Sequence, residues 1–333
     1  MNPSPTSGID RTQTEDFSDL TATAIVQAME RAVAAQLQPL RTELAELRKA
    51  AATTQAIAGF CQALRVAFFR GKTEPLAIPN IDYLIFSALQ HGIQFESYDP
   101  AHKRMVFLKD GIRFATDGYF YVLIEMFAHD QYAGLRQHVD RPYVVYDVGM
   151  NRGYASLWFA NDPQCRSVYG FELVESTYRW ALLNFSLNPR LASKIIPSCT
   201  GLAGENKTVE LLYENTGDGV STINADFFQS YWTAPRRAHA KKTKATLCRA
   251  SEVFAALPAP ANGELRVLKI DVEGAEYEIF ADLAQANRLD FDIILAEAHL
   301  GVDKFLALTP GYQVIEIVQH TDLMANLTLV RKH

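Results

Sequence analysis

Cysteine is scarce in this chain. Its 333 residues contain four, spread along the sequence as Cys61, Cys165, Cys199 and Cys248. No two of them have the Cys-x-x-Cys spacing of a zinc site, and their scatter does not suggest a disulfide framework. The sequence also lacks an apolar run of about 18 residues and the charged start of a signal peptide. We therefore expect a cytoplasmic protein with reduced thiols and no membrane span.

The sequence also has no excess of basic residues. Lysine and arginine number 32 against 38 aspartate and glutamate residues, which gives a net charge of −6. General nucleic-acid binding calls for a basic stripe, so we expect no nucleic-acid partner. Hydrophobic residues make up 48% of the chain. This content is sufficient for one large core and an appendage of roughly 100 residues.

The most informative segment is an apolar run that leads into a glycine turn. Residues 143–148, YVVYDV, are β-branched or aromatic around Asp147 and predict a strand buried on both faces. Gly149, Asn151 and Gly153 follow, and residues 154–160 have helical spacing. Glycines at these positions let a ligand approach the backbone closely.

A second apolar run, residues 167–172, ends in Glu172 about 25 residues after Asp147. This spacing fits one βαβ unit in which Glu172 binds a ribose diol. The Gly-x-Asn-x-Gly pattern differs from a dinucleotide fingerprint, and the carboxylate before it disfavours phosphate. The pair therefore predicts a cationic adenosine ligand, S-adenosylmethionine. A tight turn without a ligand is the alternative explanation of the glycines.

A third motif points to a family. Residues 267–280 read VLKIDVEGAEYEIF. Together with residues 147–153 and Glu172, this string resembles the FkbM-type methyltransferases, and the resemblance extends over about residues 104–330. It implies an α/β fold of the class I methyltransferase type, a Rossmann-like, mostly parallel sheet of seven strands with helices on both faces. It also implies methyl transfer from S-adenosylmethionine, usually to a hydroxyl oxygen.

The resemblance also implies the residues that bind the cofactor. They are Asp147, Gly149, Asn151, Gly153, Glu172, Gly201 and Leu202. Two positions depart from the family pattern: Leu173 stands where proline is common, and Gly201 stands where alanine is common. Both positions are expected near the adenosine.

Hydrophobic periodicity beyond Glu172 predicts alternating strands and helices. Helices are predicted at 175–187 and 251–257, and strands at 194–200, 208–213, 245–248, 266–271, 292–296, 312–318 and 326–330. The final strand is expected to run antiparallel in a hairpin with the strand before it. Ligands bind at the carboxyl ends of strands in such sheets, so Asp147, Glu172, residues 199–202, Asp271 and Glu297 should converge.

Acid-base or orienting residues are expected at the end of the 266–271 strand. Lys269, Asp271 and Glu273 share strand parity, and Asp271 is the first candidate for orienting or deprotonating an acceptor. The alternative is that Asp271 caps the next helix while Lys269 pairs with an acid. His299 is the fourth catalytic candidate. A divalent metal held by Glu297 and His299 with Asp271 or Glu273 is a further hypothesis, which we do not favour.

The first hundred residues predict an appendage. Residues 1–16 have the composition of a disordered tail, and residues 17–52 carry a short coiled-coil seam interrupted by Pro39. This seam favours a homo-oligomer, with packing on the chain's own catalytic domain or binding of another protein as alternatives. Residues 53–103 predict a helical cap or linker before a methyltransferase domain at 104–333. Within that domain, 105–115 predicts a hairpin and 119–135 an aromatic helix.

The segment 213–244 has a loop-like composition with aromatic and basic residues, and it is the candidate for acceptor recognition. Tyr231 and Trp232 are suited to stacking, and Arg236, Arg237 and three lysines to binding an anion, but a solvated hairpin explains the same residues. The interpretation that results is O-methylation of a hydroxyl on a carbohydrate, a glycoconjugate precursor or a related small molecule. A catalytically silent scaffold and an N-methyltransferase are the alternatives.

Overall fold

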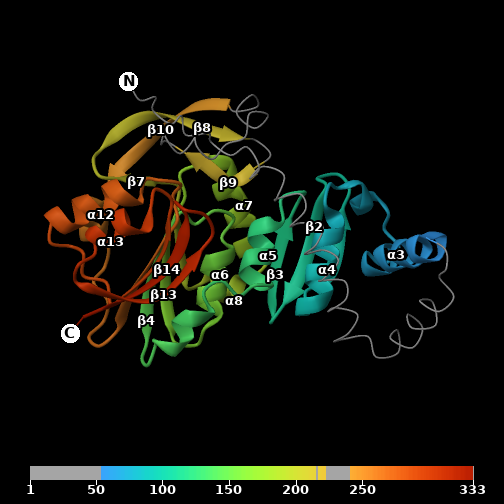
Figure 1. Ribbon diagram of the computed structural model, residues 1–333, viewed down its shortest axis with the longest axis horizontal. Coiled ribbons are helices and arrows are strands. Elements are labelled where there is room, and N and C mark those ends of the chain that lie inside the picture. Colours follow the sequence, from blue (N-terminus) through green and yellow to red (C-terminus); the bar gives the residue numbers. More distant parts are fainter. Residues whose placement is uncertain (1–53, 215–216, 223–240, 333) are drawn as a thin grey trace, which may run out of the picture. The chain divides into compact units, whose positions relative to one another are not determined.

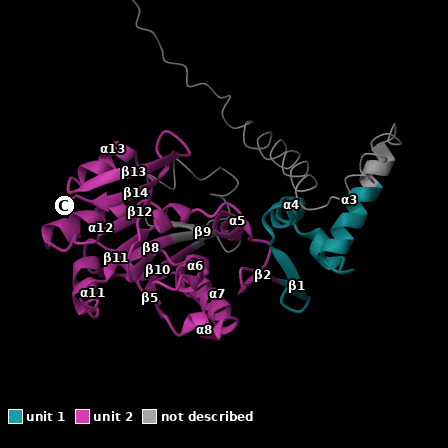
Figure 2. Ribbon diagram, turned by 90° about the horizontal axis from the view of Figure 1, so that it is seen from below, with its two compact units in different colours: residues 1–105 teal, residues 106–333 magenta. Residues whose placement is uncertain are grey.

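The computed structural model describes residues 54–214, 217–222 and 241–332, without the side chains of residues 54–58, 212–222 and 241. The chain divides into two compact units, residues 1–105 and 106–333 (Figure 2). The tail and the coiled-coil seam predicted at 1–16 and 17–52 lie outside the described residues.

The described part of the first unit is mainly helical. Its elements are α3 (Thr54–Phe68), the short 3-10 helix η2 (Glu74–Ala77), α4 (Ile81–His91) and β1 (Gln94–Asp99). Gly71 and Gly92 follow the two α-helices with φ angles of 82° and 71°. These left-handed conformations are typical of the residues that follow helix ends. The strand β1 was not anticipated from the sequence.

A β-hairpin comes next in the chain. Its strands are β2 (Arg104–Lys109), which contains the boundary between the units, and β3 (Ile112–Thr116). The two residues between them, Asp110 and Gly111, both have positive φ angles, of 51° and 79°. Two successive left-handed residues are typical of a tight hairpin turn. The predicted hairpin is therefore confirmed.

The prediction of one aromatic helix over 119–135 is wrong. The structure has a short helix, α5 (Tyr121–Phe127), and a separate 3-10 helix, η3 (Ala133–Gln137). Asp130 lies between them with a φ of 50°, and its carboxylate accepts hydrogen bonds from Trp158 Nε1 and Arg136 Nη1, both at 2.8 Å. This break depends on a tertiary contact, which helical periodicity does not encode.

The second unit is built on a seven-stranded sheet of order β13-β14-β12-β11-β4-β5-β6. The strands are β4 (Tyr143–Val148), β5 (Cys165–Phe171), β6 (Ile195–Ser198), β11 (Leu265–Ile270), β12 (Ile293–Ala298), β13 (Tyr312–Gln319) and β14 (Ala325–Arg331). β14 pairs antiparallel with β12 and β13, whereas the pairs among β12, β11, β4, β5 and β6 are parallel. The predicted sheet with an antiparallel final strand is confirmed.

Helices cover both faces of this sheet. They are α6 (Tyr154–Asn161), α7 (Glu175–Ser186), α8 (Pro189–Ala192), α11 (Ala250–Ala256), α12 (Glu276–Gln285) and α13 (Val302–Ala307). Figure 1 shows α12 and α13 on one side of the sheet and α6, α7 and α8 on the other. All six residues of β4 are buried, which explains why every residue except Asp147 is β-branched or aromatic. No helix among the described residues is long and apolar enough to cross a bilayer.

A second sheet of four strands lies within the same unit. Its order is β7-β10-β8-β9, from β7 (Gly201–Ala203), β8 (Lys207–Glu214), β9 (Gly217–Thr222) and β10 (Lys241–Arg249). The loop-like composition of 213–244 does not hold at its two ends, because β9 and the start of β10 pair antiparallel with β8, as in the hairpin alternative. Lys242, one of the predicted anion-binding lysines, instead pairs with Glu210. Tyr231, Trp232, Arg236 and Arg237 lie outside the described residues.

Candidate active site

The turn between β4 and α6 brings two strand ends into direct contact. Gly149, Asn151 and Gly153 all have positive φ angles, of 80°, 53° and 77°. A Cβ at Gly149 would lie 1.8 Å from the carbonyl oxygen of Asp271, which follows β11, and one at Gly153 would lie 2.6 Å from the ring of Phe185. The first glycine therefore lets the two strand ends meet, and the second lets α6 pack against α7.

Glu172 is held in place by the backbone. It follows β5 and is 8% exposed, and its carboxylate accepts hydrogen bonds from the amides of Asn151 and Val174, both at 2.8 Å. Because these two amides come from the glycine turn and from the start of α7, the carboxylate orientation is fixed before any ligand binds. Glu172 thus has the rigid position that a ribose-binding acid requires.

A cavity adjoins this turn, and we call it the glycine-loop cavity. It encloses about 730 Å³, including space open to solvent, and polar and apolar groups contribute about equally to its wall. Its lining consists of Val148, Gly149, Asn151, Phe171, Glu172, Leu173, Val174, Thr177, Thr200, Gly201, Leu202, Leu211, Leu247, Asp271, Val272, Glu273 and Ala275. Leu211 and Leu247 belong to the four-stranded sheet, so that sheet supplies part of the wall.

The two positions that depart from the family pattern touch one another in this wall. A Cβ at Gly201 would lie 2.5 Å from Leu173 Cδ1 and 2.5 Å from Leu247 Cδ2. Leu173 thus extends into the space that a side chain at position 201 would require. The two departures are sterically complementary.

A second cavity, which we call the acidic cavity, encloses about 990 Å³, again including space open to solvent. It is lined by Tyr119, Tyr121, Val122, Glu125, Met126, Gln131, Tyr132, Gly149, Met150, Asn151, Tyr154, Ala155, Lys269, Asp271, Glu273 and Glu297. Gly149, Asn151, Asp271 and Glu273 line both cavities. The two spaces therefore meet at the ends of β4 and β11.

Asp147 and Lys269 form a buried pair beneath this junction. They are register partners on β4 and β11, and Lys269 Nζ lies 3.2 Å from Asp147 Oδ1 and donates to the Gly149 carbonyl at 2.6 Å. Burial alone would lower the pKa of Lys269, but the nearby carboxylates, Asp147 first, raise it. Asp147 has no exposed surface and also accepts a hydrogen bond from Ser156 Oγ. Its carboxylate therefore supports the glycine turn from below and does not line either cavity.

The carboxyl groups of the acidic cavity are difficult to ionise together. Loss of solvation and the charge of Asp271 raise the pKa of Glu125 to about 7, although the Glu125 side chain is partly exposed to solvent. Burial and Asp271 likewise raise the pKa of Glu297 to about 8. Glu273, which has a φ of 55°, has a pKa raised well above its usual value by burial and by neighbouring carboxylates. Loss of solvation is the main cause of all three shifts, and repulsion by neighbouring carboxylates adds to it.

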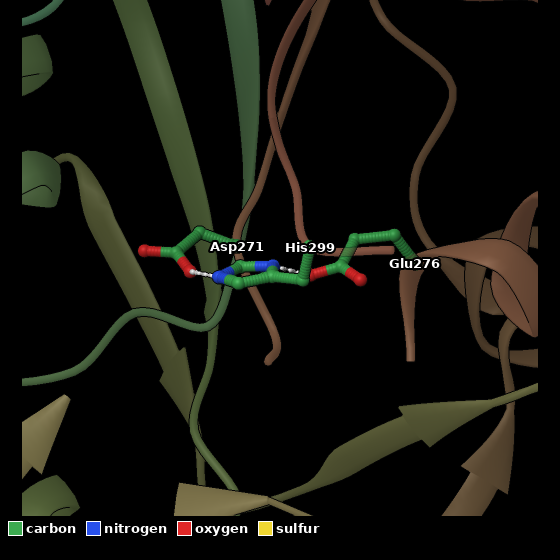
Figure 3. Close-up of side chains that lie close together, drawn as sticks. All are labelled: Asp271, Glu276 and His299. Atoms are coloured by element: carbon green, nitrogen blue, oxygen red, sulfur yellow. Dashed lines mark hydrogen bonds and ion pairs between the residues drawn. The ribbon is translucent and has the colours of Figure 1, made fainter. Parts of the chain in front are cut away.

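His299 lies at the centre of these acids and is 1% exposed. Its Nδ1 lies 2.8 Å from Glu276 Oε1, and its Nε2 lies 3.8 Å from Asp271, as Figure 3 shows. Burial alone would lower the pKa of His299, but Glu276 and the other acids raise it well above its usual value. The N-cap of α12 is Ala275, without a side-chain cap. Asp271 therefore does not cap that helix.

The structure brings most of the predicted site residues together. Of the predicted cofactor residues, Gly149, Asn151, Glu172, Gly201 and Leu202 line the glycine-loop cavity, whereas Asp147 and Gly153 lie behind the turn. Of the predicted catalytic residues, Lys269, Asp271 and Glu273 line the acidic cavity. His299 is buried within hydrogen-bonding distance of Glu276.

Sequence reasoning assigned no role to Glu276 and Glu125. Glu276 is the last acid of the string DVEGAE, directly after a turn, and this position in the motif was the available signal. Glu125 is the single acid of the apolar helix α5, YVLIEMF. An isolated charge in such a helix is a weak signal, because most such residues simply face solvent.

The comparisons with known proteins give one family. The sequence model of the family described as the methyltransferase FkbM domain matches residues 147–327, more than half of the chain. No protein of curated function matches the sequence.

Several solved structures resemble parts of the chain. An FkbM methyltransferase from Methylobacillus flagellatus KT is 16% identical, with 56% of this chain and 44% of that chain covered and a TM-score of 0.36. The tRNA m1G37 methyltransferase of M. jannaschii is 13% identical, with 69% and 57% covered and a TM-score of 0.39. Streptococcus pneumoniae Sp1610, a putative tRNA (m1A22) methyltransferase in complex with S-adenosyl-L-methionine, is 14% identical, with 61% and 72% covered and a TM-score of 0.36. This chain thus spans about half the length of the first two proteins.

Proposed function

Because the chain belongs to the FkbM methyltransferase family, we propose that it transfers the methyl group of S-adenosylmethionine to a hydroxyl of a carbohydrate, a glycoconjugate precursor or a related small molecule. The observation that carries this proposal is the junction of the two cavities. Asp271 lines both of them, so a donor in one cavity and an acceptor in the other would meet at its carboxylate.

The glycine-loop cavity has the features that the donor requires. The fixed carboxylate of Glu172 can accept two hydrogen bonds from a ribose diol. Leu173, Leu202 and Leu247 offer an apolar surface for the adenine ring. Gly149 and Asn151 of the glycine turn line this cavity together with Asp271, so the methionine portion would lie beside them.

The acidic cavity has the features that a neutral polyhydroxyl acceptor requires. Tyr119, Tyr121 and Tyr132 present aromatic surface, and Glu125 and Glu297 present oxygens that accept hydrogen bonds from hydroxyl groups. Among its described lining residues Lys269 is the one basic side chain, and it is bound to Asp147 and Gly149. The cavity therefore disfavours phosphorylated or polyanionic acceptors, nucleic acids included.

The chemistry is an in-line displacement. An acceptor oxygen forms a bond to the methyl carbon while the S–C bond breaks, and its electron pair returns to sulfur, which becomes a neutral thioether. Holding the three atoms in line accounts for much of the rate enhancement. Asp271, at the junction, orients the hydroxyl or takes its proton.

An amine acceptor is the second candidate, because a cavity rich in carboxylates attracts an ammonium group as well. The chemical nature of the labelled product separates the two. We expect that the protein transfers a radiolabelled methyl group into fractionated extracts of its source organism, and that the label is recovered on a carbohydrate oxygen. Label on nitrogen would replace the hydroxyl acceptor by an amine. Failure to bind S-adenosylmethionine in calorimetry would leave only the silent scaffold.

The role of Asp271 is tested by Asp271→Asn. We expect donor affinity to stay within about 3-fold of wild type while turnover falls by about 10²-fold or more, because amide and carboxylate have the same shape but the amide accepts no proton. Asp303→Asn, an exposed acid on α13, is the matched control and should not change turnover. Unchanged turnover in Asp271→Asn would remove this residue from the mechanism.

A further inference from the structure

A third cavity of the second unit adjoins the acidic cavity. It encloses about 1160 Å³, including space open to solvent. Its lining consists of Glu125, His129, Asp130, Gln131, Tyr132, Ala133, Gly134, Leu295, Ala296, Glu297, Glu316, Val318, His320, Asn326, Leu327 and Thr328. Four of these, Glu125, Gln131, Tyr132 and Glu297, also line the acidic cavity, whereas none lines the glycine-loop cavity. The acidic cavity therefore lies between the other two.

One face of the large sheet forms a floor that the acidic and third cavities share. Asp271 and Glu297 each come directly after the last register pair of β11 and β12. Glu297 is the register partner of Asn326 on β14, and Asn326 is that of Val318 on β13. These four residues form a row across the sheet, from the junction with the glycine-loop cavity to the edge strand. Three strand spacings of about 4.8 Å make the row roughly 14 Å long, which is more than one sugar ring spans.

The segment from α5 to η3 forms the other wall. Tyr132 lies where the acidic and third cavities meet, and its ring stacks on that of Phe159 with 5.6 Å between the centroids. A Cβ at Gly134 would lie 3.1 Å from Glu316 Oε2, so η3 and β13 approach each other closely. The break between α5 and η3 thus places a well-packed aromatic ring at the boundary of the two cavities.

The third cavity is rich in hydrogen-bonding groups, and no lysine or arginine is among its described lining residues. The carboxylates of Glu125, Glu297 and Glu316 accept hydrogen bonds from hydroxyl groups. The side-chain amides of Gln131 and Asn326 both donate and accept them. Carboxylates without a basic residue repel phosphate, sulfate and carboxylate groups, and an alkyl chain would leave these polar groups without partners. Neutral, hydroxyl-bearing rings suit such a lining.

We propose that the third cavity binds the sugar units next to the methylated one, so that the acceptor is a neutral oligosaccharide of two or more units. The inference rests on the proposed function, because the first unit occupies the acidic cavity with its hydroxyl beside Asp271. The following units lie along the row, past Glu297 and Asn326 toward Val318. A single sugar lacks the hydrogen bonds that the third cavity provides.

The test is glycan binding by the full-length protein with S-adenosylhomocysteine in the donor site, so that no transfer occurs. The probes are an array of neutral glycans of one to four sugar units and their sulfated and sialylated counterparts. We expect neutral glycans of two or more units to bind about 10-fold more tightly than the matching monosaccharides, because two or three added hydrogen bonds together contribute this much. The anionic counterparts should bind more weakly than the neutral glycans.

Val318→Trp tests the place of binding, and Ile317→Trp is its matched control. The two side chains are 46% and 45% exposed, but neighbours in a strand face opposite sides of the sheet, and only Val318 lines the third cavity. We expect Val318→Trp to bind the longer glycans as weakly as single sugars, because the indole occupies part of their space. Ile317→Trp should keep the preference for longer glycans, and calorimetry should show wild-type affinity for S-adenosylmethionine in both variants.

The outcomes separate this inference from the proposed function. Equal affinity for single sugars and longer glycans, or binding to none of the probes, would overturn the third cavity as an acceptor site. The same conclusion would follow if Val318→Trp kept both its donor affinity and the length preference. The length dependence of the wild type decides the matter even if the variant fails to fold.

The labelled product completes the distinction. Methyl transfer to a hydroxyl of a single sugar, or of another small molecule, would overturn the oligosaccharide and leave the proposed function intact. Length-dependent binding that Val318→Trp removes, without methyl transfer to any hydroxyl, would retain the third cavity as a glycan site and overturn the proposed function.

Discussion

The glycine-loop cavity is walled by leucines and fixed by backbone hydrogen bonds, whereas the acidic cavity is walled by tyrosines and by carboxyl groups that repel one another. In the first, Glu172 is held by two amides, and Gly149 and Gly201 leave no room for a side chain. In the second, loss of solvation and repulsion by neighbouring acids raise the pKa of Glu125 to about 7 and that of Glu297 to about 8. The first cavity is thus held in shape by the backbone before a ligand arrives, whereas the acids of the second resist ionisation.

Gly149→Ala should have the largest effect, because Gly149 lines both cavities and the substitution should disturb both. The new Cβ would lie 1.8 Å from the Asp271 carbonyl and would push the ends of β4 and β11 apart. We expect S-adenosylmethionine affinity to fall by more than about 100-fold and the free energy of unfolding by about 3 kcal/mol or more. Calorimetry and denaturant unfolding measure the two effects.

Gly263→Ala is the control for this substitution. Gly263 also has a left-handed φ, of 88°, but nothing lies within 4 Å of its Cβ position. Gly263→Ala should lower the free energy of unfolding only by the cost of its left-handed conformation, about 1 kcal/mol, and it should keep the donor affinity of the wild type. Equal behaviour of the two variants would show that the contact with Asp271 is unimportant.

Glu172→Gln should affect the glycine-loop cavity and leave the acidic cavity unchanged. The amide loses one acceptor and the negative charge, so we expect donor affinity to fall by about 10–100-fold, or roughly 1.4–2.7 kcal/mol. Turnover at saturating donor should not change, because Glu172 does not line the acidic cavity. Glu175→Gln, an exposed acid at the start of α7, is the control. A lower turnover of Glu172→Gln at saturating donor would mean that the two cavities are one functional site.

Gly201→Ala should have the smallest effect. Its methyl group would overlap Leu173 Cδ1 and Leu247 Cδ2, which can move, so we expect a loss of about 1–3 kcal/mol in unfolding free energy and weaker donor binding. The double variant Leu173→Ala/Gly201→Ala should recover part of the unfolding free energy and part of the donor affinity. The smaller side chain at 173 leaves space for the new methyl group at 201. Gly311→Ala, with nothing within 4 Å of its Cβ position, is the control. Additive effects in the double variant would refute the complementarity of the two positions.

The sequence predicted those features of the site that depend on local pattern. The apolar run of β4, the glycine turn and the acid at the end of β5 each occupy a few consecutive residues, and the structure places them as the spacing indicates. The role of Asp147 was not visible in the same way. Register places it opposite Lys269, and this pairing turns it away from both cavities.

The remaining features depend on contacts between distant segments. Glu276 is 23 residues from His299 in sequence, and no local pattern predicts that their side chains meet. The break between α5 and η3 depends on Trp158, which donates a hydrogen bond to Asp130. The four-stranded sheet likewise depends on pairing between β8 and β10, whose residues are separated by the segment 215–240. Periodicity identified parts of these strands but not their partners.

The lining that the two cavities share, Gly149, Asn151, Asp271 and Glu273, has a thermodynamic consequence. A molecule bound in one cavity becomes part of the surface that the molecule in the other cavity meets. Whatever factor the donor contributes to acceptor affinity, the acceptor must return to the donor. In the proposed reaction the sulfur loses its positive charge, so this mutual preference differs between the substrates and the products.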